Sequence, residues 1–117
     1  VVDDDDSVLR ALRRLLSAAG FEARAFHTGR EFLDALSENG IGCVLLDIRM
    51  PGLDGFVVAR ELAGRTPFIF LTAHDDNETR RRAEQQGASG FLRKPASERK
   101  ILAAIRHALN DAPGDSP

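Results

Sequence analysis

Residues 43–47 read Cys-Val-Leu-Leu-Asp, a short apolar run that stops abruptly at an acidic residue. An uninterrupted apolar run of this length is typical of a parallel strand covered by helices on both faces, because a strand with one face in water would alternate apolar and polar residues. The sequence therefore predicts a buried strand over residues 43–46, with Asp47 at its carboxyl end.

The same pattern recurs downstream, where the apolar run Phe-Ile-Phe-Leu at 68–71 ends at Thr72. Two short apolar segments, at residues 1–2 and 91–92, predict further strands, and residues 22–26 are also predicted as a strand because the segment is short and bounded, although it alternates poorly. The first of these looks like the last two residues of a strand, so we expect a few residues to precede Val1.

Apolar residues at helical spacing fill the intervals between the predicted strands. Thr28 stands where it would cap the second helix, and Asn39-Gly40 would end that helix. Gly20 and Gly87 follow the first and fourth helices, as glycine commonly does at a helix carboxyl end. The five helices are predicted within residues 8–19, 29–38, 56–62, 75–86 and 101–109.

Five strands that alternate with five helices predict an α/β fold with a central, mostly parallel sheet between two layers of helices. In such sheets, ligands bind beyond the carboxyl ends of the strands. Several side chains with useful chemistry follow the carboxyl end of a predicted strand, and we expect them to meet in one crevice: Asp3, Asp4, Asp47, Thr72 and Lys94.

Three carboxylates in one crevice would repel one another unless a cation compensates their charge. Oxygen ligands without a nearby soft donor favour Mg²⁺, which typically shares its coordination positions between carboxylates, waters and a phosphate. Beside such an ion Asp47 could act as a nucleophile toward a phosphoryl group. Thr72 could donate a hydrogen bond to a phosphoryl oxygen, and Lys94 could supply a point charge, aimed inward by a cis bond to Pro95.

The motifs resemble those of the response regulator receiver family of bacterial two-component systems, in the same order and over essentially the whole chain. They are Val-Val-Asp-Asp at 1–4, Asp-Ile-Arg-Met-Pro-Gly-Leu-Asp-Gly at 47–55, Leu-Thr-Ala at 71–73 and Phe-Leu-Arg-Lys-Pro at 91–95. The resemblance implies a flavodoxin-like (βα)5 three-layer sandwich with a central parallel five-stranded sheet, whose usual strand order is 2-1-3-4-5.

The resemblance also implies roles for individual residues. Asp47 would accept the phosphoryl group from a sensor histidine kinase, Asp4 would bind Mg²⁺ directly and Asp3 through water. The backbone carbonyl of Arg49 would complete the protein ligands. Thr72 and Phe91 would form a switch that alters the surface of the fourth helix, fifth strand and fifth helix after phosphorylation. No turnover of a separate substrate is expected, only phosphorylation and dephosphorylation at Asp47.

Composition limits the range of partners. A chain of 117 residues with a net charge of −2 suits one domain without a strongly basic field, so we expect no direct binding of nucleic acid. No apolar run is long enough to span a bilayer. The single cysteine, Cys43, cannot form an internal disulfide and looks like a buried apolar thiol, which fits the cytoplasm. We predict a receiver domain over residues 1–111 and a tail or linker over 112–117.

Several charged residues have simpler interpretations. Asp5 and Asp6 are expected to cap the first helix. His27, His74 and His107 lack metal-ligand spacing and are interpreted as surface or loop residues, although His74 would lie near the phosphoryl site.

The predicted fourth helix is polar along most of its length. Only Thr79 and Ala83 are expected to face inward, and the run Arg80-Arg81-Arg82 is interpreted as a solvated face that an acidic partner could also use. We expect this helix to be the most mobile one in the unphosphorylated state.

Three alternative functions remain to be distinguished. A small Mg²⁺-dependent phosphohydrolase of the haloacid dehalogenase type would carry a second aspartate where this chain has Arg49. A flavodoxin-type cofactor binder would have a Ser-, Thr- and Gly-rich first loop instead of four aspartates. A degenerate receiver would act only through protein interactions. The output could be an attached domain, a hybrid kinase or a phosphorylation-dependent homodimer.

Overall fold

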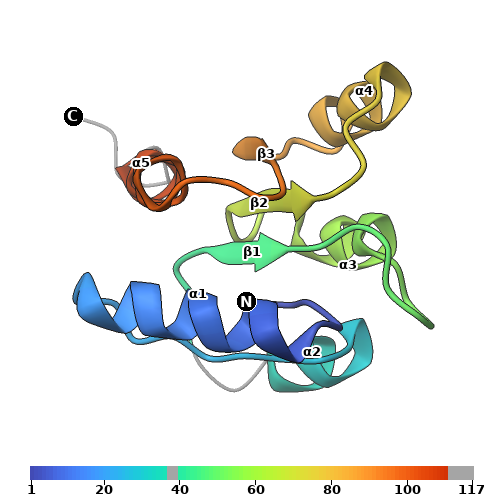
Figure 1. The fold of residues 1–117 in the computed structure, drawn as a ribbon. Coiled ribbons are helices and arrows are strands. Elements are labelled where there is room, and N and C mark those ends of the chain that lie inside the picture. Colours follow the sequence, from blue (N-terminus) through green and yellow to red (C-terminus); the bar gives the residue numbers. More distant parts are fainter. Residues whose placement is uncertain (37–39, 111–117) are drawn as a thin grey trace.

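The computed structural model describes residues 1–36 and 40–110. Its helices and strands alternate after the first two helices, as Figure 1 shows. In chain order they are α1 (Asp6–Ala18), α2 (Gly29–Leu36), β1 (Val44–Leu46), α3 (Gly55–Leu62), β2 (Phe68–Thr72), α4 (Asn77–Gln85), β3 (Gly90–Arg93) and α5 (Glu98–Asn110).

The sheet is parallel, with β2 between β1 and β3. Val2 extends it, because single parallel bridges join this residue to Leu46 on one side and to Phe26 on the other. The Val2 amide donates to Leu45 O at 2.8 Å, and the Asp3 amide donates to Phe26 O at 3.0 Å. The order across the sheet is therefore the one that the receiver resemblance implies, and the α/β fold class is confirmed.

The predicted strand over 22–26 is much shorter in the structure, since only Phe26 forms a bridge. Beyond Val1 the extended segment that contains Ala23 faces Cys43 and Val44 across a groove of about 560 Å³. A strand needs a paired neighbour along its length. Here the bonds to the neighbouring segment come from Arg24, whose carbonyl accepts from the Val1 amino group at 2.8 Å, and from Phe26. Cys43, which borders the groove, is half-buried rather than fully buried.

Alternate residues of the strands point into two apolar cores, one on each face of the sheet. Val44, Leu46, Phe68 and Phe70 pack with α2, α3 and α4. Leu45, Ile69 and Leu71 pack with α1 and α5 on the opposite face. Figure 1 shows α5 on one side of the strands and α3 and α4 on the other. The uninterrupted apolar runs of β1 and β2 follow from this double coverage.

Side chains at the helix starts confirm the predicted caps at Asp5 and Thr28, whereas Asp6, also expected to cap the first helix, is its first residue and pairs with His27. Asp5 accepts from the amides of Ser7 and Val8 at the start of α1, and Thr28 Oγ1 accepts from the Glu31 amide at 3.0 Å. Gly20 and Gly87 follow α1 and α4 with positive φ angles of 94° and 82°, which glycine adopts without strain. The predicted end of the second helix at Asn39 lies outside the described residues.

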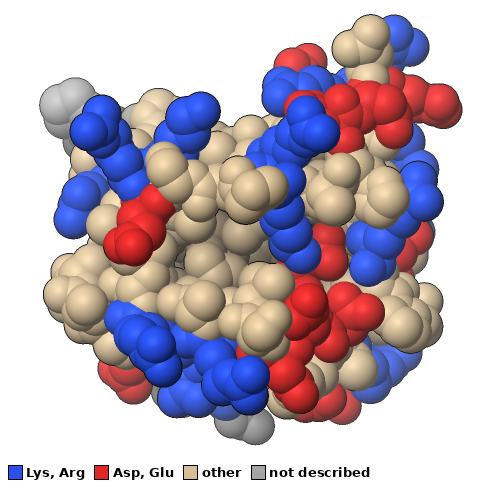
Figure 2. Space-filling view, viewed as in Figure 1, with Lys and Arg blue, Asp and Glu red and all other residues tan. Residues whose placement is uncertain are grey.

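Charge is distributed over the surface in both signs. On the face that Figure 2 shows, Lys and Arg side chains stand in several separate groups with acidic groups between them. In the described part of the chain, no helix has the length and apolar character that crossing a membrane requires.

Candidate functional site

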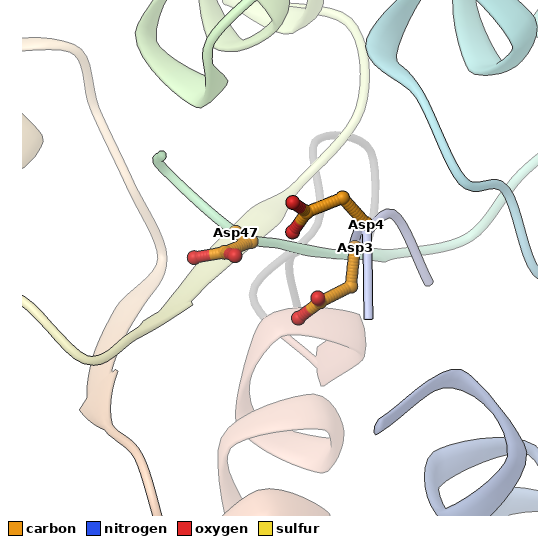
Figure 3. Close-up of side chains that lie close together, drawn as sticks. All are labelled: Asp3, Asp4 and Asp47. Carbon is orange, nitrogen blue, oxygen red and sulfur yellow. The ribbon is translucent and has the colours of Figure 1, made fainter. Parts of the chain in front are cut away.

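Three carboxylates lie close together just beyond Val2 and just beyond the carboxyl end of the neighbouring strand β1. Asp3 and Asp4 follow Val2, and Asp47 follows β1 (Figure 3). One oxygen from each of the three lies within 4.8 Å of the others. Asp3 and Asp47 are only 2% and 8% exposed, whereas Asp4 is open to solvent. The sheet thus holds two of the carboxylates in the interior and leaves the third accessible.

Lys94 brings a positive charge to this cluster from the end of β3. Its Nζ donates to Asp3 Oδ2 at 2.6 Å and to Asp47 Oδ2 at 3.3 Å. The Lys94 amide donates to Thr72 O at 2.8 Å, which fixes the residue beside the end of β2. The Lys94–Pro95 peptide bond is cis, as expected.

Thr72 is the last residue of β2 and is fully buried. Its hydroxyl oxygen accepts a hydrogen bond from the His74 amide at 3.2 Å. The hydroxyl hydrogen stays available for another acceptor, because the oxygen uses only a lone pair in this bond. The loop after β2 is therefore bonded to the Thr72 hydroxyl.

The backbone around Asp47 is tightly packed. The Ile48 amide donates to Asp47 Oδ1 at 2.8 Å, and the Gly55 amide donates to Ile48 O at 2.6 Å. A Cβ on Gly55 would lie 2.2 Å from the Asp47 carbonyl oxygen, so only glycine allows this approach. Asp54 caps α3 by accepting from the Val57 amide at 3.0 Å.

The electrostatics of the cluster favour a further cation. Burial raises the pKa of Asp47, and the neighbouring Asp3 carboxylate raises it further, while the Lys94 charge opposes both. Burial would lower the pKa of Lys94, but the hydrogen bond to Asp3 and the charges of Asp47 and Asp3 outweigh it, so this pKa is raised. One ammonium group is thus shared between two buried carboxylates, and the exposed Asp4 adds a third negative charge.

The donor set fits a hard divalent cation. The three converging groups are all carboxylates, and Asp4 provides an accessible point of entry. Oxygen ligands of this kind suit Mg²⁺, which keeps several waters when it binds to carboxylates. Arg49 lies in the loop two residues after Asp47 with an exposed side chain, and the role of its carbonyl as a ligand stays a prediction.

The structure brings together the residues that the sequence singled out. Lys94 donates hydrogen bonds to both Asp3 and Asp47. Thr72 lies beside them, because its backbone carbonyl accepts from the Lys94 amide. Phe91 lies in β3 with its ring half-buried, 6.5 Å from the Phe70 ring. The close approach of Gly55 was missed, although the Asp-Gly pair at 54–55 carried a turn signal.

Two expectations about charged side chains need correction. The run Arg80-Arg81-Arg82 is exposed, but it is more than a solvated face, because two of its members cover aromatic rings. The Arg80 guanidinium lies 4.9 Å from the Phe91 ring centre, and that of Arg82 lies 4.0 Å from the Phe56 ring centre. Gln86 is a further inward contact of α4, besides the half-buried Thr79 and the buried Ala83.

The histidines occupy the predicted kinds of position. His27 and His107 are exposed, and His27 pairs with Asp6. His74 is half-buried in the loop after β2.

Comparison with known proteins identifies the family. The response regulator receiver domain family matches residues 1–106, and the chain belongs to this family. The response regulator protein TmoT of Ectopseudomonas mendocina is 39% identical over 116 residues, covering 97% of this chain and 53% of TmoT. The transcriptional regulatory protein FixJ of Bradyrhizobium diazoefficiens is 38% identical over 115 residues, covering 96% of this chain and 56% of FixJ.

A solved structure supports the same assignment. The response regulator receiver protein from Burkholderia phymatum superimposes with a TM-score of 0.85 at 45% identity, covering 96% of this chain and 94% of that one. The chain is therefore a receiver domain of the two-component response regulators. It spans about half the length of the curated relatives TmoT and FixJ.

Proposed function

We propose that Asp47 accepts a phosphoryl group from a sensor histidine kinase, and that Asp3, Asp4 and the Arg49 carbonyl hold Mg²⁺ beside it. The observation that carries this proposal is the cluster of Asp3, Asp4 and Asp47, whose oxygens lie within 4.8 Å of one another around the end of β1. Membership of the receiver family supports the same assignment.

The transfer step needs little covalent chemistry from the protein. A carboxylate oxygen of Asp47 attacks the phosphorus of the kinase phosphohistidine, and the new P–O bond forms as the P–N bond breaks. The imidazole leaves with the electron pair of that bond and takes a proton from solvent. Mg²⁺, when bound, neutralises charge on the carboxylates and on the phosphoryl oxygens.

Thr72 and Lys94 would position the transferred group. The Thr72 hydroxyl can donate to a phosphoryl oxygen while its own oxygen still accepts from the His74 amide. Lys94 Nζ already lies 3.3 Å from Asp47 Oδ2 and can move from the carboxylate to a phosphoryl oxygen over a short distance. Both side chains would then favour the phosphorylated form of Asp47.

We further propose that the domain controls an output region in the cytoplasm through the face formed by α4, β3 and α5. Relatives such as FixJ, whose name describes a transcriptional regulatory protein, are about twice as long as the matched segment. The output could also be a homodimer formed through the same face. The membership in the receiver family argues against the phosphohydrolase and the flavodoxin-type alternatives.

The first experiment is intact mass after incubation with acetyl phosphate and Mg²⁺, with EDTA as the metal-free arm. The wild type should gain one phosphoryl group only with Mg²⁺, and Asp47→Asn should gain none. Asp54→Asn is the matched control, because it changes a nearby carboxylate that caps α3 and keeps the cap. A wild type that stays unmodified would favour a degenerate receiver that acts only through protein interactions.

The metal ligands can be tested separately by calorimetric titration with Mg²⁺. Asp4→Asn should weaken binding strongly, and Asp3→Asn, as a ligand through water, by about 10- to 100-fold. Asp6→Asn serves as the control, since Asp6 belongs to the same acidic run but lies in the first turn of α1. Equal losses in all three variants would show that only the general negative charge matters.

A further inference from the structure

The attachment of α4 to the rest of the domain is unusual in its chemistry. Ala83 is the only fully buried residue of this helix. Three long polar side chains also hold it to the rest of the domain, Arg80 and Arg82 in the helix and Gln86 at its carboxyl cap. Figure 2 shows basic and acidic side chains interleaved on the part of the surface where α4 lies. Specific polar contacts therefore substitute for the apolar stripe that anchors most helices.

The carboxyl end of α4 is fixed to α3. Gln86, which caps the helix, donates through Nε2 to the backbone carbonyl of Phe56 at 3.0 Å. The Arg82 guanidinium lies 4.0 Å from the centre of the Phe56 ring. Both contacts are made to Phe56 of α3, whose side chain is buried in the core. Gln86, at this end of α4, lies farther along the chain from Thr72 than the start of the helix does.

The amino end of α4 is held differently, through the loop that follows Thr72. Arg80 donates through Nε to Asp75, and its guanidinium carbon lies 4.9 Å from the centre of the Phe91 ring in β3. Asp75 comes three residues after Thr72, and the intervening His74 amide is bonded to the Thr72 hydroxyl. Arg80 therefore connects the loop beside the phosphoryl site to an aromatic ring on the α4–β3–α5 face.

We propose that Asp75 and Arg80 form a latch that holds Phe91 in its present position and opens when Asp47 is phosphorylated. This inference rests on the proposed function of Asp47. A phosphoryl group that draws in the Thr72 hydroxyl displaces the loop bonded to it, and Asp75 moves with the loop. Once Asp75 and Phe91 separate, Arg80 cannot contact both of them, so the guanidinium no longer lies over the Phe91 ring.

The latch predicts by how much the affinity for a phosphoryl analogue changes when Arg80 is removed. Contacts present only in the unphosphorylated conformation oppose binding of any ligand that selects the other one. Removing Arg80 should therefore tighten binding of a phosphoryl analogue by about two- to fivefold, which is the worth of a cation–π contact at an exposed site. The magnitude for an exposed site applies because the Arg80 side chain is half-exposed.

The test is calorimetric titration with beryllium fluoride and Mg²⁺, since beryllium fluoride mimics the phosphoryl group without a covalent step. The variants are Arg80→Ala, Asp75→Ala, the double variant, and Arg81→Ala as an exposed control on the same helix. Each single latch variant should bind the analogue more tightly than the wild type. The double variant should gain no more than either single one, because both substitutions break one device. Thermal melting checks that every variant is folded.

Two results would overturn the latch. One is an Arg80→Ala affinity equal to that of Arg81→Ala, and the other is a double variant whose gain equals the sum of the two single gains. Failure of the proposed function looks different, because the wild type would then neither bind beryllium fluoride nor gain mass from acetyl phosphate, and the latch would have nothing to regulate. Hydrogen exchange of the amides at 73–76 gives a second readout, and it should rise in Arg80→Ala but not in Arg81→Ala.

Discussion

The ammonium group of Lys94 lies 2.6 Å from Asp3, whereas its distance to Asp47 is 3.3 Å. The lysine is therefore bound more closely to Asp3, which we propose as a metal ligand, than to Asp47, which we propose as phosphoacceptor. Without a metal ion, Lys94 acts as the internal counter-ion of the cluster. In the function that we propose, Mg²⁺ would compensate the charge on Asp3, and Lys94 would then be free to serve a phosphoryl group at Asp47.

Lys94→Met should destabilise the metal-free protein. The substitution leaves two buried carboxylates without their shared donor, which costs about 1–3 kcal/mol in the free energy of unfolding. Mg²⁺ should reduce this difference, since it supplies the missing positive charge. Urea unfolding in EDTA and in Mg²⁺ measures both quantities, with Lys100→Met on the exposed first turn of α5 as the control. Equal stability of the two variants in EDTA would contradict the counter-ion role.

Asp47→Asn should stabilise the metal-free protein at neutral pH. The pKa of Asp47 is raised in the folded state by burial and by Asp3, so its ionised form opposes folding. Below the ordinary carboxyl pKa of 3.8 the group is protonated in both states and carries no penalty. Stability of the wild type is therefore lost as the pH rises from there through the folded-state pKa.

The pH dependence gives the measurement for this variant. Unfolding free energies in EDTA should favour Asp47→Asn increasingly as the pH rises from about 3.8 to 7, while the two proteins converge at the acidic end. Mg²⁺ should stabilise the wild type more than the variant, because the variant lacks one carboxylate of the cluster. A difference that does not change with pH would mean that ionisation of Asp47 carries no such penalty.

Gly55→Ala should disturb the backbone of Asp47 directly. The added Cβ would lie 2.2 Å from the Asp47 carbonyl oxygen and 2.7 Å from Ile48 Cα, and backbone atoms cannot give way as a flexible side chain can. We expect a loss of about 1–3 kcal/mol in unfolding free energy together with slower phosphorylation by acetyl phosphate. Gly40→Ala is the matched control, since its Cβ would meet nothing within 4 Å.

Hydrogen exchange should identify α4 as the least protected helix among the described ones. Only Ala83 is fully buried in α4, whereas α3 buries Phe56, Val58 and Leu62. Few buried apolar contacts allow a helix to open locally at low free-energy cost. Exchange rates in the unphosphorylated protein check this expectation, and α4 amides among the slowest of the domain would refute it.

Much of the fold could be predicted because its signals are local. The apolar runs before Asp47 and Thr72 specify buried strands, and Thr28 marks the start of a helix by its capping hydroxyl. The convergence of the carboxylates followed from a general rule about strand ends, since Asp3 and Asp47 follow neighbouring positions of a parallel sheet.

The remaining features depend on contacts between segments far apart in the sequence. Nothing near Arg80 indicates that it covers Phe91, and nothing near Gln86 indicates that it reaches the carbonyl of Phe56. The predicted strand over 22–26 shortens to a single bridge at Phe26 because a strand depends on its neighbour, and the bonds on that side come from Val1 and Asp3, which flank Val2.

The groove beside Val1 bears on the kind of residues that can stand before Val1 in a chain. Its lining includes the segment around Ala23 and the segment around Cys43, and the amino group of Val1, which also borders it, donates to Arg24 O. Residues that precede Val1 would therefore begin beside the segments around Ala23 and Cys43. Residues with a preference for strands should be tolerated there, and glycine or proline should weaken the pairing of the segment that leads into Asp3, which lies between Phe26 and Leu46 in the sheet.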